Sequence, residues 1–210
     1  MNWKNNSINF EEIPKGEYIN FDWKEDDVKS FDFSKCKYLI IWHHQSKEKS
    51  FNNLPHIPDL LYLEVNWSSS TSLKGLSKYQ NLKRLELHYC TKLETLDGIE
   101  SVNREIEHIH INQSKKLTNH KRITILKKLK VLCYNDCGAI ENLSFLNELP
   151  HLRDFRFVNS NILDGDLSPI LHHPNLESVG FLNKRHYSHK DTYIKDYLKN
   201  RRITNAQQNL

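Results

Sequence analysis

The stretch NLKRLELHYCTKLETLDGIESV, residues 81–102, contains two hydrophobic periods in succession. In its first part Leu85 and Leu87 alternate with the polar residues Glu86 and His88, which is typical of a β-strand with one buried face. In its second part the apolar residues step by three, which indicates a helical or extended segment that returns the chain. A strand followed by a return segment of this length predicts one coil of a solenoid.

The first part of this stretch recurs along the chain. Copies of the pattern L-x-x-L-x-L-x-x-[small or polar] begin at residues 60, 82, 106, 129, 152 and 176, in steps of 22, 24, 23, 23 and 24 residues, and a weaker copy begins at residue 36. One coil cannot bury its apolar side chains alone, so each coil is expected to stack on its neighbours. The repeats therefore predict a parallel sheet whose third, fifth and seventh residues point away from the core.

This pattern resembles the leucine-rich repeat family, with consensus L-x-x-L-x-L-x-x-[NC]-x-L, over residues 36–184. LETLDGIESV (93–102) and IENLSFLNELPHLRDF (140–155) look most like its short bacterial, internalin-like type. The resemblance implies an α/β solenoid, a right-handed horseshoe with a parallel concave sheet. The family's usual Asn at the ninth place is replaced by small residues that can still point inward, namely Ser68, Cys90, Ser114, Cys137 and Ser160.

The two ends of the chain are predicted to cover the solenoid core. Residues 1–35 are expected to form an N-terminal cap with one degenerate extra coil, in which Ile19 and Phe21 alternate with polar residues. Residues 185–210 are expected to form a capping helix followed by a frayed tail, ITNAQQNL. We expect these caps and the repeats to make one structural domain.

Composition excludes several classes of protein. Thirty Lys and Arg residues are nearly matched by 26 Asp and Glu, so the net charge of +4 does not by itself favour nucleic acid. The N-terminus has no apolar signal-peptide core and no run approaches the length of a membrane span. The four cysteines lack a zinc-type CxxC pair, and reduced thiols are expected. We therefore expect a cytoplasmic protein.

The outward strand positions carry a cluster of aromatic and charged side chains in the N-terminal half of the concave face. Trp and Tyr beside desolvated charges are typical of protein-binding hot spots, although packing of these rings against the N-terminal cap would give the same pattern. We expect a protein partner to bind this face through Tyr38, Trp42, Tyr62, Glu64, Trp67, Arg84, Glu86, His88, Tyr89, His108, His110, Asp136, Asp154 and Arg156.

Two hypotheses of another kind remain at the centre of this face. Glu86, His110 and Cys133 are consecutive in one outward column, which is the order of an activated thiol nucleophile. His88 and His108, with His110 and Cys133, also offer ligands for zinc. An open sheet has no pocket and no free backbone amides for an oxyanion, so we expect neither catalysis nor a metal or cofactor. The histidines then predict a pH-sensitive binding patch.

The basic stretch KKLTNHKRITILKKLK, residues 115–130, is the remaining candidate. No aromatic residue is interleaved for stacking on bases, so a solvated convex face is favoured over nucleic-acid binding. The sequence as a whole predicts a noncatalytic protein-binding module, such as an adaptor or an immunity-type protein that neutralises a toxin. We expect it to be a monomer, without a nucleic-acid or membrane partner.

Overall fold

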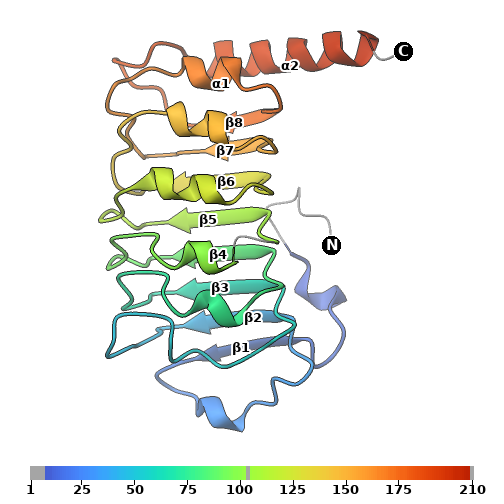
Figure 1. Ribbon diagram of the computed structural model, residues 1–210, viewed down its shortest axis with the longest axis vertical. Coiled ribbons are helices and arrows are strands. Elements are labelled where there is room, and N and C mark those ends of the chain that lie inside the picture. The colour runs from blue at the N-terminus through green and yellow to red at the C-terminus, as the bar shows by residue number, and fades with distance from the viewer. Residues whose placement is uncertain (1–7, 103–104, 209–210) are drawn as a thin grey trace.

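The computed structural model describes residues 8–102 and 105–208, within which eight parallel strands form one open sheet (Figure 1). Each strand pairs with the next strand in the sequence, so that the sheet is a ladder with one strand per coil. The predicted leucine-rich-repeat solenoid is confirmed. The strands are β1 (Tyr18–Asp22), β2 (Tyr38–Trp42), β3 (Tyr62–Asn66), β4 (Arg84–His88), β5 (His108–Asn112), β6 (Val131–Asn135), β7 (Asp154–Arg156) and β8 (Ser178–Gly180).

The segments between the strands return the chain in short helical turns, which are mostly 3-10 helices. This is the geometry expected for apolar residues that step by three, because side chains three apart eclipse in a 3-10 helix. The described helices are η1 (Phe10–Glu12), η2 (Val28–Ser30), η3 (Leu76–Lys78), η4 (Ile99–Val102), η5 (His120–Ile125), η6 (Ser144–Glu148), α1 (Ser168–His172) and α2 (Asp191–Gln208).

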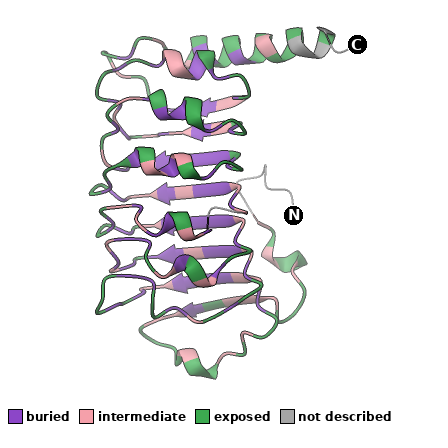
Figure 2. Cartoon of the chain, viewed as in Figure 1, coloured by how far each residue is buried: buried purple, intermediate pink, exposed green. Residues whose placement is uncertain are grey.

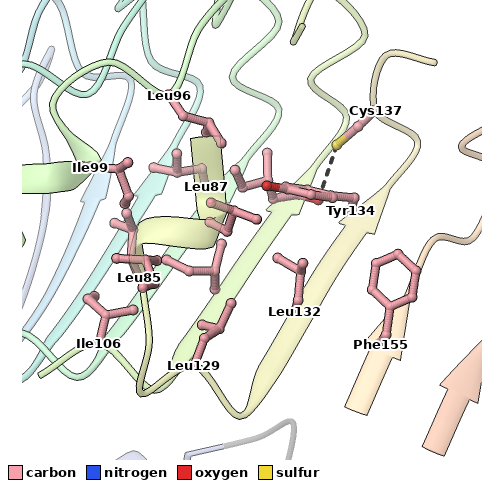
Figure 3. Close-up of a cluster of buried hydrophobic side chains, with 14 of the residues drawn as sticks. Leu85, Leu87, Leu96, Ile99, Ile106, Leu129, Leu132, Tyr134, Cys137 and Phe155 are labelled. Atoms are coloured by element: carbon pink, nitrogen blue, oxygen red, sulfur yellow. Dashed lines mark hydrogen bonds between the residues drawn. The ribbon is translucent and has the colours of Figure 1, made fainter. Parts of the chain in front are cut away.

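The core lies between the strands and the return segments, where the two periods of residues 81–102 meet. Leu85 and Leu87 of β4 are completely buried, and Leu96 and Ile99 of the return segment pack toward them from the other side (Figure 3). Full burial of such a side chain contributes about 1.5–3 kcal/mol. The same places in every coil form one continuous core, so the stability of each coil depends on its neighbours.

The ninth place of each coil points inward, as the small residues there predict. The hydroxyl of Ser114 donates to the carbonyl of Cys90 over 3.2 Å, and the thiol of Cys137 donates to the carbonyl of Ile111 over 3.3 Å. These bonds join each coil to the preceding one and give the buried hydroxyl and thiol a hydrogen-bond partner. The residues buried at this place are His44, Ser68, Cys90, Ser114, Cys137 and Ser160.

At the N-terminal end, β1 extends the sheet by one strand and pairs with β2 along its whole length. Phe21 of β1 is buried, and its ring centroid lies 5.3 Å from that of Phe31 and 6.4 Å from that of Phe33. This aromatic cluster covers the first coil of the core.

At the C-terminal end, α2 lies beside α1 and β8 and covers the end of the stack of coils (Figure 1). Ile194 and Leu198 are buried against the last coil, whereas Tyr193 and Tyr197 are 54% and 39% exposed. The helix continues to Gln208 through the segment that the sequence predicts to fray. Hydrogen bonds from Arg201 help to hold the helix in place. Its guanidinium donates to the backbone carbonyls of Leu171 in α1 and of His173 and Leu176 between α1 and β8.

Candidate recognition surface

The side chains of the third, fifth and seventh residues of each coil occupy the face of the sheet opposite the core, which we call the outer face. The strand register places them in the columns that the repeat predicts: Tyr62 pairs with Arg84 and then His108, and Glu64 with Glu86 and then His110. Side chains in one column belong to neighbouring strands about 4.8 Å apart and can contact one another. The strands therefore pair in the register that the repeat predicts.

The centre of the outer face is a buried ion pair between Arg84 and Glu86, which are only 2% and 6% exposed. The Nε of Arg84 donates to Oε1 of Glu86 over 2.5 Å, and its Nη2 reaches the same oxygen. The guanidinium also lies over the ring of Tyr62, 5.7 Å from its centroid. Burial alone would raise the pKa of Glu86, but the hydrogen bond from His88 and the charge of Arg84 outweigh it and lower the pKa to about 2.

A second carboxylate, Glu64, is held in the same way by its neighbours on β3. The hydroxyl of Tyr62 donates to its Oε2 over 2.5 Å, and the amide of Asn66 donates to its Oε1 over 2.8 Å. Tyr62 is buried, and its ring packs against Phe10 of η1 with 5.9 Å between centroids. Packing against the N-terminal cap, the alternative raised from the sequence, therefore accounts for the position of this ring.

Glu86 also brings two histidines together. Nε2 of His88 lies 2.9 Å and Nδ1 of His110 lies 3.8 Å from Oε2 of Glu86, and the candidate ligand atoms of the three residues all lie within 4.8 Å of one another. Burial lowers the pKa of His110 to about 4, so its ring is neutral at pH 7. Its Nε2 accepts a hydrogen bond from the amide of Asn135 over 3.2 Å. This arrangement has the donor set of a divalent-cation site, with one carboxylate oxygen already engaged by Arg84.

Cys133, the third member of the predicted thiol triad, pairs in register with His110 but is only 3% exposed. Burial raises the pKa of its thiol to about 12, so the thiol is protonated at neutral pH. An activated nucleophile requires the opposite shift of the pKa. The thiol-enzyme hypothesis therefore lacks its chemical basis, and the groups that meet as potential metal ligands are Glu86, His88 and His110 instead.

The edge of the outer face, just beyond the strands, carries exposed aromatic rings. Trp67 and Tyr89 are 41% and 42% exposed, and their rings stack with 4.9 Å between centroids and 12° between planes. On the other side of Trp67, His43 stacks at 5.3 Å and 19°, and it is fixed by a 2.7 Å contact with Asp22. Trp42 also packs against Trp67 at 5.5 Å. We call the row His43, Trp67 and Tyr89 the aromatic ridge.

The backbone of the aromatic ridge has the left-handed conformation, with φ of 52° at His43 and 54° at both Trp67 and Tyr89. Each of these residues donates its backbone N–H to the carbonyl that ends the next strand; Trp67, for example, donates to His88 over 2.9 Å. Bulky residues rarely adopt this conformation, because their Cβ crowds the neighbouring carbonyl. The stacked coils hold the rings there.

The other predicted site residues separate into buried and accessible groups. Arg84, Glu86, His108 and Tyr62 are nearly inaccessible, so in this conformation they support the outer face rather than offer contact atoms. Figure 2 shows buried and intermediate positions along the strands of the sheet. Arg156 and Asp154 form a 2.9 Å ion pair on β7, and Asp136 accepts a hydrogen bond from Gln113. The residues that are at least partly accessible are Tyr38, Trp42, Glu64, Trp67, His88, Tyr89, His110, Asp136, Asp154 and Arg156.

One feature of this surface was missed from the sequence: a hollow of about 530 Å³ beside the aromatic ridge, lined by Lys49, Trp67, Tyr89 and Lys92 among others. Its lysines come from return segments of different coils, so no sequence pattern places them together. The only signal in the sequence is the aromatic residue at the eighth place of two successive coils.

The basic stretch is largely neutralised by the neighbouring coils. Arg122 contacts Asp97 and Glu100 at 3.2 and 3.3 Å, and Lys128 contacts Glu105 at 2.8 Å. Further ion pairs join Lys115 to Asp136, Lys121 to Glu148 and Lys130 to Glu107. Cations that already have carboxylate partners give little net attraction for phosphate, so the solvated convex face is the better interpretation.

Comparison with known proteins agrees with this fold. No protein-family profile matches the chain. Internalin C2 of Listeria monocytogenes superposes with a TM-score of 0.55 at 16% identity, over 73% of this chain and 66% of that one. The disease resistance protein RPS4B of Arabidopsis thaliana is 24% identical over 85% of this chain, but the match spans only 19% of that relative.

A leucine-rich-repeat protein of Leptospira interrogans is 18% identical over 79% of this chain, with a TM-score of 0.39. The fold and the repeats together define the chain as a leucine-rich-repeat protein with short, internalin-like coils. Among the described residues, no helix combines the length and apolarity that crossing a membrane requires.

Proposed function

We propose that the protein is a noncatalytic module that binds a protein partner through the accessible side chains of the outer face and through the aromatic ridge at its edge. The observation that carries this proposal is the pair Trp67 and Tyr89, each about two-fifths exposed on strained backbone. Large exposed aromatic side chains beside charged groups are typical of binding hot spots. The buried pairs around Glu86 support the proposal indirectly, because they fix the surface in one shape before binding.

The biological setting that we propose is a cytoplasmic, monomeric adaptor or immunity-type protein that covers a toxin or another protein. It is supported by the fold and by the name of the plant relative, a disease resistance protein. The match covers only a fifth of that relative, so no more of that protein's activity is carried over.

The test is capture of the partner from the native host by the wild-type protein and by variants. Replacing Trp67 and Tyr89 by Ala is expected to abolish capture of a specific protein, because hot-spot side chains carry most of the binding energy. Tyr193→Ala is the matched control, since Tyr193 is also exposed but lies on α2 at the far end of the solenoid. Equal capture by the Trp67/Tyr89 variant and the wild type would contradict the proposal.

A second candidate function is binding of a divalent cation by Glu86, His88 and His110, and the close approach of their ligand atoms favours it. The neutral state of His110 suits a metal ligand, while the pairing of Glu86 with Arg84 opposes a further positive charge. Titration of metal-free protein with Zn²⁺ tests the idea, with His110→Gln as the variant and the exposed His151→Gln as the control. Tight stoichiometric binding that only His110→Gln removes would establish a cation site.

A further inference from the structure

The hollow beside the aromatic ridge has a charge that its surroundings do not balance. Lys49 and Lys92 line it and are exposed, and in the described part of the chain neither forms an ion pair. The remaining lining is aromatic, amide or hydroxyl, and it contains no carboxylate. The outer face differs, because there Glu86 and Asp154 are paired with Arg84 and Arg156. An anionic group would therefore gain contacts in this hollow without displacing a native ion pair.

Backbone strain is also concentrated at this hollow. Eight described residues other than glycine have positive φ, and half of them are His, Asn or Asp, which tolerate the left-handed region best. Lys, Trp and Tyr do not, yet Lys49, Trp67 and Tyr89 all have φ of 54° and all line the hollow. Strained residues gather at ligand-binding sites more than elsewhere. The backbone thus singles out the same hollow as the charge does.

The stacking of the aromatic ridge restricts what kind of ligand fits. Trp67 lies between His43 and Tyr89, which come from the preceding and following coils and stack on it within 19° and 12° of parallel. Both faces of its indole are therefore covered, and its edge is exposed. Nucleobases and sugar rings bind to aromatic faces, whereas ring edges carry partial positive charge, which favours carboxylates.

We propose that the hollow between Lys49 and Lys92 binds an acidic segment of the protein partner, with carboxylates at the two lysines and an adjacent apolar side chain against the edges of Trp67 and Tyr89. This inference rests on the proposed function and specifies the chemistry of the partner. The two lysines provide charge complementarity, and the exposed aromatic edges provide the apolar contact that the segment needs for affinity.

The test uses a random linear peptide library, selected on the wild-type protein and synthesised for measurement by fluorescence anisotropy. We expect the selected peptides to be enriched in Asp and Glu next to Leu, Ile or Phe, and to bind more weakly as salt is raised. The double variant Lys49→Gln/Lys92→Gln is expected to weaken binding about fivefold to tenfold, the range for two exposed charge pairs. The control is Lys116→Gln/Lys190→Gln, which removes the same charge from exposed lysines outside the hollow.

The outcomes separate this inference from the proposed function. Selected peptides without acidic enrichment, an empty selection, or equal weakening by the control variant would each overturn it. Binding of an oligothymidine probe that Lys49→Gln/Lys92→Gln abolishes would overturn it in favour of nucleic acid. A further outcome is that Lys49→Gln/Lys92→Gln captures the native partner with unchanged affinity while the Trp67/Tyr89 variant loses it. In that case the hollow does not bind an acidic segment, and the proposed recognition function stands.

Discussion

The N-terminal and C-terminal coils place different side chains at the same left-handed backbone position. The residue after each strand, at the eighth place of the coil, has φ between 51° and 61° in six successive coils. In the N-terminal coils this residue is His43, Trp67 or Tyr89, and in the C-terminal coils it is Gln113, Asp136 or Asn159.

The C-terminal half of the column uses residues that suit the left-handed turn. Asn and Asp tolerate this conformation, and Gln113 and Asp136 are joined by a hydrogen bond between their side chains. From His43 to Asp136 this residue donates its N–H to a carbonyl at or just beyond the end of the next strand, as Tyr89 does to Asn112 and Asp136 does to Val158. The stacking of coils therefore dictates the turn, and the aromatic residues adopt it at a local cost of about 1–2 kcal/mol each. Under the proposed function, the contact of these rings with a partner offsets that cost.

The largest expected effect is the loss of stability from substitutions in the core, which both halves share. Leu85→Ala in the N-terminal half and Leu132→Ala in the C-terminal half should each lower the free energy of unfolding by about 2–5 kcal/mol, because both side chains are completely buried. Urea unfolding measures this, with the exposed Leu163→Ala as control. If one half tolerated its substitution while the other did not, the coils would not form one continuous core.

Acid is expected to destabilise both sides of the solenoid. Burial lowers the pKa of His110 on the outer face and of His120 in η5 to about 4, so the unfolded chain binds protons that the folded chain does not. Stability is fully present above pH 6.5 and falls as the pH is lowered from 6.5 to 4, by up to roughly 3 kcal/mol for each histidine. Urea midpoints across this range measure it.

His120→Phe separates the two contributions, because His120 packs edge-on against Tyr134 and an aromatic ring of similar shape keeps that contact. The variant should lose only its own share of the acid sensitivity. Below this window Glu86, whose pKa is lowered to about 2, removes further stability as the pH falls from 4.5 toward 2. A flat stability profile between pH 7 and 4 would disprove this electrostatic account.

Exchanging the two halves' side chains should separate binding from folding. Trp67→Asn combined with Tyr89→Asn gives the ridge the residue type of Asn159, which suits the backbone. We expect a loss of partner affinity of about 2 kcal/mol, roughly thirtyfold, as for a hot spot, while the fold persists. Titration of the captured partner measures affinity and circular dichroism checks the fold. Retained affinity would show that the ridge does not contact the partner.

The smallest expected effect is the reverse exchange. Asn159→Trp places a bulky residue on left-handed backbone where φ is 61°, and should lower the free energy of unfolding by about 1 kcal/mol. Urea unfolding measures it against Asn200→Trp, an exposed position without positive φ. A stabilising result would mean that aromatic residues suit this turn, and the argument from strain would fail.

The fold was predictable because the repeat fixes both period and register. Leu85 and Leu87 alternate with Glu86 and His88, and this alone decides which side chains reach the core. The inward place of Ser114 followed from its small size. No part of that pattern depends on contacts between distant side chains, so sequence reasoning was sufficient.

Accessibility within the outer face was not predictable, because it depends on how neighbouring columns pair. Arg84 is buried since it bonds Glu86 and lies on Tyr62, and Tyr62 is in turn covered by Phe10 from the cap. The hollow could not be predicted from the sequence for a similar reason, because Lys49 and Lys92 belong to separate return segments. The strain at Trp67 becomes visible only once the backbone is known.

The indole N–H signal of Trp67 in a nitrogen-edited NMR spectrum tests the central claim most directly. It can be assigned by comparison with Trp67→Phe, and Trp23, which packs beside Phe21 in the cap, serves as an internal reference. We predict that adding the captured partner shifts or broadens the Trp67 signal and leaves that of Trp23 in place. A saturated complex in which the Trp67 signal has not moved would contradict recognition at the aromatic ridge.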